Sequence, residues 1–277
     1  HSRGLNLGGL TPLRSRPATV AAILCPMARR PDCIVCGSCV VDLLCRPVNL
    51  ARPIGDRVLY ETDPVVLTGG GITINSGVTL ARLGMGVGVF SYVGRDAWAP
   101  IVHHLLRDEG VDDELLIAHP TAATSTTVVA IDKGGERCFF HSVGAPKLLD
   151  ASAFYDRLDA LGRSRFILLG YYSLLPHLEP DLHDVLARLR ARGCRTALDA
   201  AGDGGAMQPL DRILPQLDVY VPSLAEARHQ TGEDDPRRII EAYRGCAAPG
   251  ILGVKLGVDG VLLSPTPGEF IDIPIVD

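Results

Sequence analysis

Aromatic residues are scarce in this sequence, at 5% of 277 residues, and no apolar run approaches the ~20 residues that a membrane span needs. An excess of basic residues is missing too, because 27 Lys and Arg against 32 Asp and Glu leave a net charge of −5. We therefore expect neither a membrane nor a nucleic acid as a partner. The remaining composition, 47% hydrophobic and 21% charged, is globular and excludes a disordered chain or a collagen-like fibre.

Cysteine is also sparse, since eight residues in 277 are far too few for a disulfide scaffold. Three of them, Cys33, Cys36 and Cys39, have the spacing of part of an iron–sulfur motif, but Leu43 occupies the position of a fourth ligand. The run lies in an apolar, strand-like stretch, so we interpret these cysteines as small buried core residues. Reduced cysteines of this kind predict a cytoplasmic protein.

The first thirty residues differ in character from the rest. Residues 1–30 are rich in Arg, Gly and Pro and have no sustained hydrophobic period. Their apolar run, 20–24, is short for a signal peptide and is not followed by a clean cleavage site. We interpret 1–30 as an extension outside the fold and Met27 as the natural start.

From residue 33 onward, strand-like and helix-like segments alternate. The expected strands are 33–41, 87–93, 126–132, 137–142, 166–169, 195–198, 218–221, 251–256 and 261–263, and the expected helices are 72–83, 97–109, 182–191, 224–231 and 237–245. This order predicts a three-layer α/β fold over 31–277, with a mainly parallel sheet and helices on both faces. The hairpin-forming segments, about 45–66 and 124–142, predict a small β-sheet that acts as a lid.

Three consecutive glycines, Gly69 to Gly71, precede the expected helix at 72–83, and Asn75 lies in its first turn. Glycines there let a ligand approach the backbone, and a helix N-terminus presents free N–H groups. The spacing matches neither a Walker A loop nor a dinucleotide fingerprint. A glycine-rich turn that only caps a helix remains an open alternative.

Further polar residues follow other expected strands. Asp42 closes the first apolar run, where its carboxylate would accept hydrogen bonds from two sugar hydroxyls at the carboxyl edge of the sheet; a turn aspartate is the alternative. Ser223 and Glu226 have the spacing of a helix capping box, which is a sufficient structural role by itself. The segment from Lys255 to Gly260 predicts a tight hairpin that a nucleotide base or ribose can approach.

Together these segments resemble the PfkB/ribokinase-like carbohydrate kinase family over residues ~33–277. The similar segments, in family order, are Gly70-Gly71…Asn75…Ala81-Arg82-Leu83-Gly84, Val93-Gly94-Arg95-Asp96, Thr124–Thr127 with Gly135-Glu136-Arg137, Pro222-Ser223-Leu224-Ala225-Glu226, and Lys255-Leu256-Gly257-Val258-Asp259-Gly260. Each segment alone is weakly specific, but five in order are strongly so.

The resemblance implies a ribokinase-like fold that transfers the γ-phosphate of ATP to a sugar hydroxyl. It assigns the sugar to Asp42, Gly70, Gly71, Asn75 and Tyr171, which follows an expected strand end. It assigns the nucleotide side to four further residues, Ser223, Lys255, Gly257 and Gly260. The implied cofactors are ATP and Mg²⁺, to which a monovalent cation can be added, and Glu226 would act on Mg²⁺ through water.

Two features depart from the family pattern. Ser223 stands where the family usually has Asn, although its hydroxyl still offers a polar contact. The family's second signature, Asp-Thr-x-Gly-Ala-Gly-Asp, which supplies the anion hole and the general base, has no match before Asp277. No catalytic residue is therefore assigned, and we expect the printed sequence to be part of a longer polypeptide that continues into this motif.

Two alternatives stay open at the level of sequence. One is a non-catalytic sugar- or nucleotide-binding protein on the same fold, and the other is a nucleoside kinase of the same family. A nicotinamide-dependent oxidoreductase is disfavoured because the dinucleotide glycine pattern is missing after the first strand. The apolar residues of the lid strands need a cover, which predicts a homodimer formed through the lid.

Overall fold

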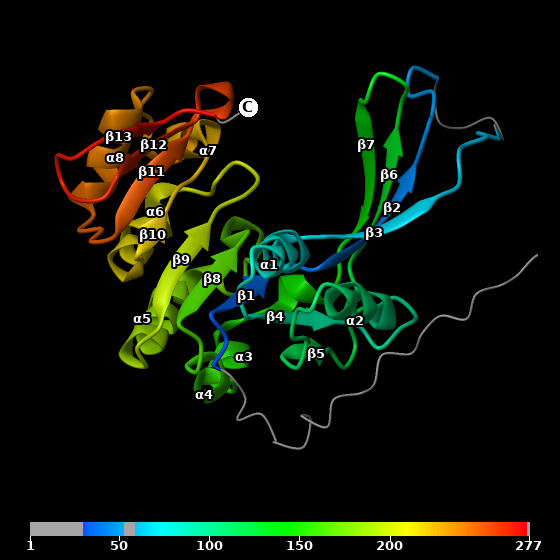
Figure 1. The fold of residues 1–277 in the computed structure, drawn as a ribbon, viewed down its shortest axis with the longest axis horizontal. Helices are drawn as coiled ribbons and strands as arrows, with labels where there is room; N and C mark the ends of the chain where they lie inside the picture. Colours follow the sequence, from blue (N-terminus) through cyan, green and yellow to red (C-terminus); the bar gives the residue numbers. More distant parts are fainter. Residues whose placement is uncertain (1–29, 53–58, 276–277) are drawn as a thin grey trace, which may run out of the picture.

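The computed structural model describes residues 30–52 and 59–275. Two parts are plain in Figure 1, a large α/β body and a small β-sheet that stands away from it. The expected extension over 1–30 with Met27, apart from Arg30, lies outside the described residues, as does Asp277.

The large sheet has nine strands in the order β13-β12-β11-β10-β9-β8-β1-β4-β5. From β11 to β5 every pairing is parallel, whereas β12 pairs antiparallel with both β11 and β13. The strand bounds are β1 Cys33–Gly37, β4 Val87–Val93, β5 Leu116–Ala118, β8 Phe166–Gly170, β9 Arg195–Asp199, β10 Val219–Tyr220, β11 Ile251–Lys255, β12 Val261–Ser264 and β13 Ile271–Ile273. This arrangement confirms the predicted mainly parallel α/β sheet.

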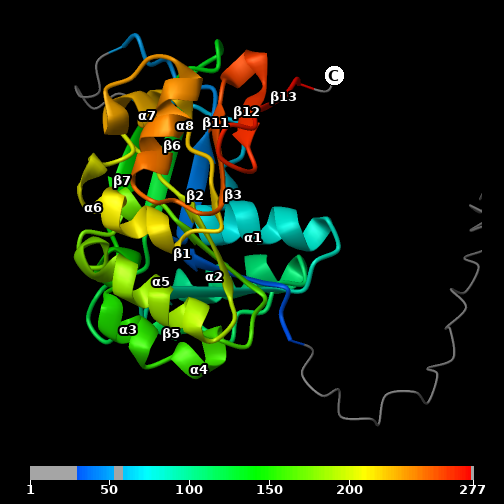
Figure 2. The same cartoon turned by 90° about the vertical axis from the view of Figure 1, so that its left-hand side faces the viewer.

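Helices cover both faces of this sheet (Figure 2). The long helices are α1 Ile72–Arg82, α2 Ala99–Asp108, α5 Leu182–Ala191, α7 Leu224–Thr231 and α8 Pro236–Gly245, and the short ones are α3 Ala151–Tyr155, α4 Leu158–Leu161 and α6 Met207–Ile213. Alternation along β1 explains the two cores: Cys33 and Val35 pack with α1 and α2, whereas Ile34 and Cys36 pack with the helices of the other face.

The cysteine run is part of these cores. Cys33, Cys36 and Cys39 are at most 3% exposed, and burial raises the pKa of the Cys33 and Cys39 thiols to about 11. Over residues 30–52 and 59–275, no cluster of three or more His, Cys, Asp or Glu side chains is placed to hold a metal ion. The prediction of buried core cysteines is confirmed.

The small sheet has the order β3-β2-β6-β7, with bounds β2 Val40–Cys45, β3 Val66–Gly70, β6 Thr126–Ile131 and β7 Arg137–Ser142. Its strands β6 and β7 form the hairpin expected within 124–142. The other two strands flank the expected segment 45–66. Strand β2 ends at its first residue, Cys45, and β3 begins at its last residue, Val66, and the two strands pair antiparallel. We call this sheet the lid.

One sequence prediction is wrong in this region. The apolar run 33–41 is not one strand, because the chain leaves the large sheet at Gly37 and enters the lid at Val40. Gly37 has φ +133, and a Cβ there would lie 2.8 Å from Ile72, so this turn requires glycine. Asp42 therefore lies within β2 of the lid and does not close a strand at the edge of the large sheet.

The other predicted elements are present, with ends that differ by at most two residues, and η5 Gly257–Asp259 forms the expected tight connection between β11 and β12. None of the helices in the described part of the chain has both the length and the apolarity that crossing a bilayer requires. The carboxyl ends of β1, β8, β9, β10 and β11 all open toward the lid side of the body (Figure 1).

Candidate active site

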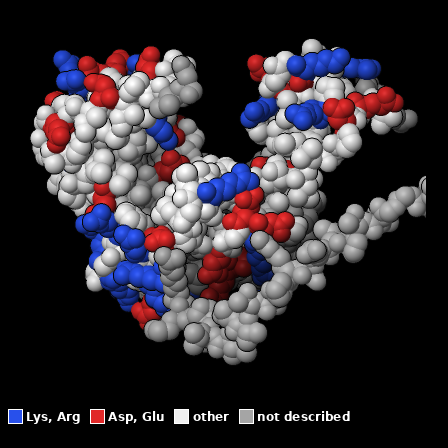
Figure 3. All heavy atoms as spheres, in the orientation of Figure 1, with Lys and Arg blue, Asp and Glu red and all other residues white. Residues whose placement is uncertain are grey.

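A hollow separates the lid from the large body (Figure 3). At its base lies a cavity of about 270 Å³ that is lined from both parts. Asp42, Thr127 and His141 line it from the lid strands, and Gly71 and Tyr171 line it from the body. Three residues that the sequence predicts for sugar binding, Asp42, Gly71 and Tyr171, therefore meet at one cavity.

A larger cavity, about 620 Å³, lies at the opposite, amino-terminal edge of the large sheet, beside β1 and β4. Arg30, Asp32 and Gly86 are among its lining residues, and none of the predicted site residues lines it. Parallel sheets bind ligands at the carboxyl ends of their strands, so the smaller cavity is the candidate ligand site.

Asp42 is half-buried in the lid and stands opposite Thr68 on β3 and Thr127 on β6. Burial raises the pKa of its carboxyl, while a hydrogen bond from Thr127 and the nearby His141 lower it by a smaller amount. A carboxylate of this kind accepts hydrogen bonds from ligand hydroxyls at little further desolvation cost.

The glycine motif wraps around this carboxylate. A Cβ on Gly70 would overlap Oδ2 of Asp42 and lie 3.1 Å from its Cγ. A Cβ on Gly71 would collide with the carbonyl oxygen of Ser38, and Gly71 has φ 80 and ψ 165 at the N-terminus of α1. The backbone therefore requires a glycine at position 71, whereas a side chain at position 70 would have to displace the carboxylate of Asp42.

Tyr171 follows β8 in a left-handed conformation, with φ 61 and ψ 39. Its backbone N–H donates to the carbonyl oxygen of Asp199 over 3.0 Å, which fixes the turn at the edge of the sheet. Left-handed conformations of residues other than glycine cost free energy and concentrate at functional sites. The geometry is consistent with the predicted place of Tyr171 in the sugar pocket.

Asn75 lies on the exposed side of α1 and is not among the residues that line the cavity. Its backbone N–H donates to Gly71, so its described role is in the first turn of the helix. Ser38, which the sequence reasoning did not single out, does line the cavity, and its hydroxyl is buried with no hydrogen-bond partner among the described residues.

Asp96 anchors the point at which the chain enters the lid. Its carboxylate accepts hydrogen bonds from the N–H and hydroxyl of Thr124 and from the N–H groups of Trp98 and Ala99, over 2.7–3.2 Å. Burial alone would raise the pKa of Asp96, but these four donors lower it below its usual value. Asp96 thus fixes Thr124, two residues before the lid strand β6 begins.

The predicted nucleotide-side residues gather at the carboxyl ends of β10 and β11. Ser223 caps α7, and Glu226 completes the capping box by accepting from the N–H and hydroxyl of Ser223 at 2.7 and 2.8 Å. The second oxygen of Glu226 accepts the N–H of Ala201 at 3.1 Å, which ties α7 to the loop after β9. The predicted capping box is confirmed.

Lys255 ends β11, and its Nζ lies 3.4 Å from Oδ1 of Asp199, which ends β9 on the other side of β10. Gly257 has φ 64 and open space around it, whereas a Cβ on Gly260 would overlap the carbonyl oxygen of Ile273. The approach of β13 is therefore a sufficient structural reason for Gly260, and its contact with a nucleotide remains a prediction.

A magnesium ion does not fit these residues alone. Both carboxylate oxygens of Glu226 are engaged by the protein's own donors, and the described part of the chain offers no cluster of three potential ligands. Mg²⁺ prefers several waters and substrate phosphates over a cage made only of protein. The metal role of Glu226 stays a prediction, and no step below depends on it.

The profile of the pfkB family carbohydrate kinases matches residues 30–276, which is nearly all of the described chain. The chain belongs to this family. The family assignment confirms the resemblance that the five ordered motifs predict, and the fold around them is the predicted ribokinase-like fold.

Two sequence relatives illustrate the similarity. Fructokinase-1 of Zea mays is 28% identical over 178 residues, which are 62% of this chain and 49% of that protein. A fructokinase of Vibrio alginolyticus is 41% identical over 70 residues, 25% of this chain and 23% of that protein. The chain thus spans about half the length or less of these curated relatives.

Solved structures show the same fold at low identity. The ribokinase of Arabidopsis thaliana, complexed with ribose and ATP, has a TM-score of 0.72 at 20% identity and covers 89% of this chain and 78% of its own. The fructokinase of Halothermothrix orenii has a TM-score of 0.66 at 21% identity, with 88% and 86% covered.

Proposed function

We propose that this protein is a sugar kinase that transfers the γ-phosphoryl group of ATP to a hydroxyl of a sugar bound between the lid and the large sheet. The observation that carries the proposal is the cavity in which the half-buried carboxylate of Asp42 meets Gly71 and Tyr171. Membership of the carbohydrate kinase family and structural neighbours in complex with ATP and Mg²⁺ support the reaction class.

Within this proposal the chain positions its two substrates on one sheet edge. Asp42 accepts hydrogen bonds from sugar hydroxyls, and the N–H groups at the start of α1 face the same ligand. Ser223, Lys255 and Gly257 border the nucleotide, and Lys255 offers a charge for a phosphate in exchange for Asp199.

In the transfer, a bond forms between the sugar oxygen and the γ-phosphorus while the bond from that phosphorus to ADP breaks. The proton of the sugar hydroxyl leaves to a general base, which we place in the family's second signature. Among the described residues none follows a glycine-rich anion loop in the way that this signature requires. Asp199, at the end of β9, is paired with Lys255 and is not assigned this role.

The test is a panel of sugars with the purified protein. ADP release is followed by a coupled assay with Mg²⁺ and ATP, in the presence and absence of K⁺, for ribose, fructose and adenosine, and binding of each is measured by calorimetry. We expect one sugar to bind and to be phosphorylated. Asp42→Asn should weaken its binding at least about tenfold, because a charged hydrogen-bond acceptor is lost. The matched control, Asp63→Asn, changes an exposed aspartate outside the cavity.

The outcomes separate the candidate functions. Turnover of adenosine in preference to both sugars identifies a nucleoside kinase, and binding without ADP release identifies a non-catalytic binding protein. Equal binding by wild-type protein and Asp42→Asn contradicts the assignment of the sugar site.

We also propose a homodimer formed through the lid. Phe140 and Leu67 are 49% and 40% exposed on lid strands and do not line the cavity, and apolar area on a free sheet favours association. Sedimentation at micromolar concentration should show a dimer, which Phe140→Ser weakens; a monomer for the wild-type protein contradicts the proposal. The seven free cysteines of the described part are consistent with our proposal of a reducing, cytoplasmic location.

A further inference from the structure

The substrate cavity carries basic side chains that the motifs do not explain. His141 and Lys147 line it together with Asp42, which is the single carboxylate among its lining residues. The chain has only three lysines, Lys133, Lys147 and Lys255. One of the three therefore lines the cavity, on the side where the resemblance to the family places the sugar.

The register of the lid sets one row of polar side chains. Asp42, Thr127 and His141 are directly paired across β2, β6 and β7, so their side chains share one face. The Thr127 hydroxyl lies 3.0 Å from Nδ1 of His141 and also hydrogen-bonds Asp42. Nδ1 of His141 is thus engaged by the lid, and within the described chain its Nε2 has no protein partner.

Lys147 borders this row from the segment that follows β7. It lies in the short 3-10 helix Ala145–Leu148, whose first residue donates its N–H to the carbonyl oxygen of Ala123 at 2.7 Å. The backbone of Lys147 is therefore fixed at the base of the lid. Its side chain is exposed, and it forms no ion pair or hydrogen bond with the residues that the structure describes.

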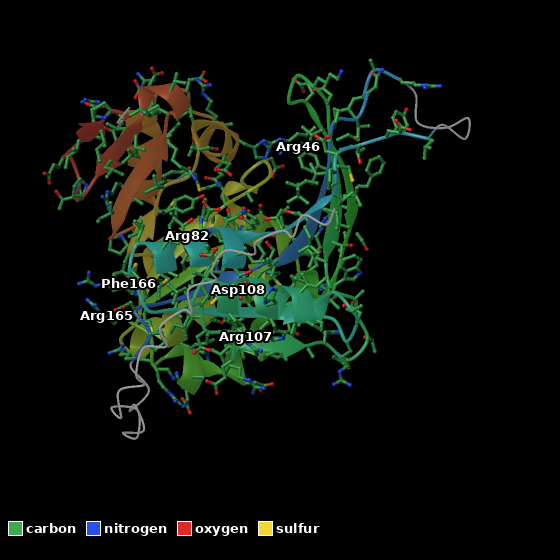
Figure 4. All side chains as sticks on the ribbon, turned by 45° about the vertical axis from the view of Figure 1, so that its right-hand side comes forward. Arg46, Arg82, Arg107, Asp108, Arg165 and Phe166 are labelled. Carbon is green, nitrogen blue, oxygen red and sulfur yellow. The ribbon has the colours of Figure 1, made fainter. Side chains whose placement is uncertain are left out.

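Further positive charge lies along the same strand. Arg46 follows β2 two residues beyond Leu44, so strand alternation puts it on the side of Asp42, and Figure 4 labels it on the lid beside the hollow. It is exposed and takes part in no ion pair within the described residues. Unpaired charges of one sign around a hollow attract ligands of the opposite sign.

A neutral sugar would leave the ammonium of Lys147 without a partner at the cavity wall. An acidic group on the same ligand would satisfy it, because hydrogen bonds between a charged donor and a charged acceptor are about twice as strong as neutral ones. The hydroxyls of that ligand would then bind to Asp42. The negative charge of Asp42 repels the acidic group, which orients the ligand with its acid toward Lys147.

We propose that the cavity binds a sugar carrying an acidic group, a carboxylate or a phosphate, with its hydroxyls on Asp42 and its acid on Lys147 and Nε2 of His141. The proposal rests on the assignment of this cavity as the sugar site. It narrows the substrate class from sugars in general to sugars that carry a negative charge.

The test measures binding by calorimetry for three six-carbon probes: fructose, gluconate and fructose 6-phosphate. We expect gluconate or fructose 6-phosphate to bind at least about tenfold more tightly than fructose, and the better of the two distinguishes a carboxylate from a phosphate. Lys147→Met should remove this preference, and Lys147→Arg should keep most of it. Lys133→Met, an exposed lysine at the hairpin turn, is the matched control and should change nothing.

Fructose binding as tightly as both acids overturns the proposal, as does an acid preference that survives in Lys147→Met. Because Lys147 is exposed, its variants should melt like the wild-type protein, and a melting curve checks this. Binding of fructose that depends on Asp42 but shows no acid preference refutes this inference alone. No binding of any probe, in wild-type protein and Asp42→Asn alike, refutes the sugar site as well.

Discussion

Alanine substitutions at the two adjacent glycines Gly70 and Gly71 should affect two different properties, ligand binding and stability. At Gly70 the new methyl group would overlap Oδ2 of Asp42, a side-chain atom that can rotate away, and Gly70 does not have a positive φ. At Gly71 the methyl group would meet the carbonyl of Ser38, which is backbone, at φ 80 and ψ 165, where residues other than glycine are strained. Gly70→Ala should therefore affect binding, and Gly71→Ala should affect stability.

The magnitudes follow from the groups involved. Displacing the Asp42 carboxylate removes at least one charge-assisted hydrogen bond to the sugar, worth about 1.5–3 kcal/mol, so the Kd should rise about 10- to 150-fold in Gly70→Ala. The strained conformation in Gly71→Ala costs about 1–3 kcal/mol before any collision is counted. For a chain of this size that lowers Tm by about 2–12 °C.

Calorimetry of sugar binding and a thermal melt of the unliganded protein measure both effects. A double-mutant cycle isolates the cause: if Gly70→Ala acts through Asp42, then adding it to Asp42→Ala should weaken binding no further. Gly70→Ala with wild-type affinity, or an additive loss in the double variant, would refute the reasoning about the carboxylate. Gly71→Ala with an unchanged Tm would refute the reasoning about the backbone.

Three carboxylates give further predictions. Burial holds the pKa of Asp42 above its usual value, so the affinity for the sugar should begin to fall at a higher pH than an ordinary aspartate would give. Measurements of Kd against pH check this, and an affinity that does not change on acidification contradicts it. The lowered pKa of Asp96 stabilises the fold above the pKa of an unfolded aspartate, and this stability is lost as pH falls through the folded pKa. Asp96→Asn, which frees Thr124, should therefore lower Tm most at neutral pH and least in acid. In the absence of Mg²⁺, Glu226→Gln should lower the free energy of unfolding by about 1–3 kcal/mol, because only one of the two amide atoms can accept a hydrogen bond, whereas Glu226 accepts from both Ser223 and Ala201. A denaturant melt that matches the wild type would contradict this structural role of Glu226.

Much of the large body was predictable because its elements are locally encoded. The strand at 87–93, the helix at 182–191 and the capping box at Ser223 rest on periodicity, glycine stops and cap residues within a few positions. Helices α3, α4 and α6 escaped prediction because four to seven residues are too few to show a helical period. Strands β5 and β13 are three residues long and were missed for the same reason.

The error at 33–41 has a different origin. Residues on both sides of Gly37 are apolar, and apolarity alone does not tell which sheet a strand joins. The division depends on pairings far apart in sequence, since β1 pairs with β4 and β8 whereas β2 pairs with β6. Such long-range pairings are set by the packing of the whole chain, so the sequence could single out Asp42 as a candidate site residue while placing it in the wrong sheet.

His141 shows what a closer reading of local sequence offers. The predicted hairpin turn at 133–136 already pairs Ile131 with Arg137, and counting outward in register places His141 opposite Thr127. The signal was therefore available within sixteen residues. What the sequence does not contain is the next pairing, of Thr127 with Asp42, which brings His141 to the cavity that Asp42 lines. Glycine and carboxylate motifs therefore point to candidate site residues from local sequence, whereas a residue such as His141, which the lid's register brings beside them, is visible only once the sheet is assembled.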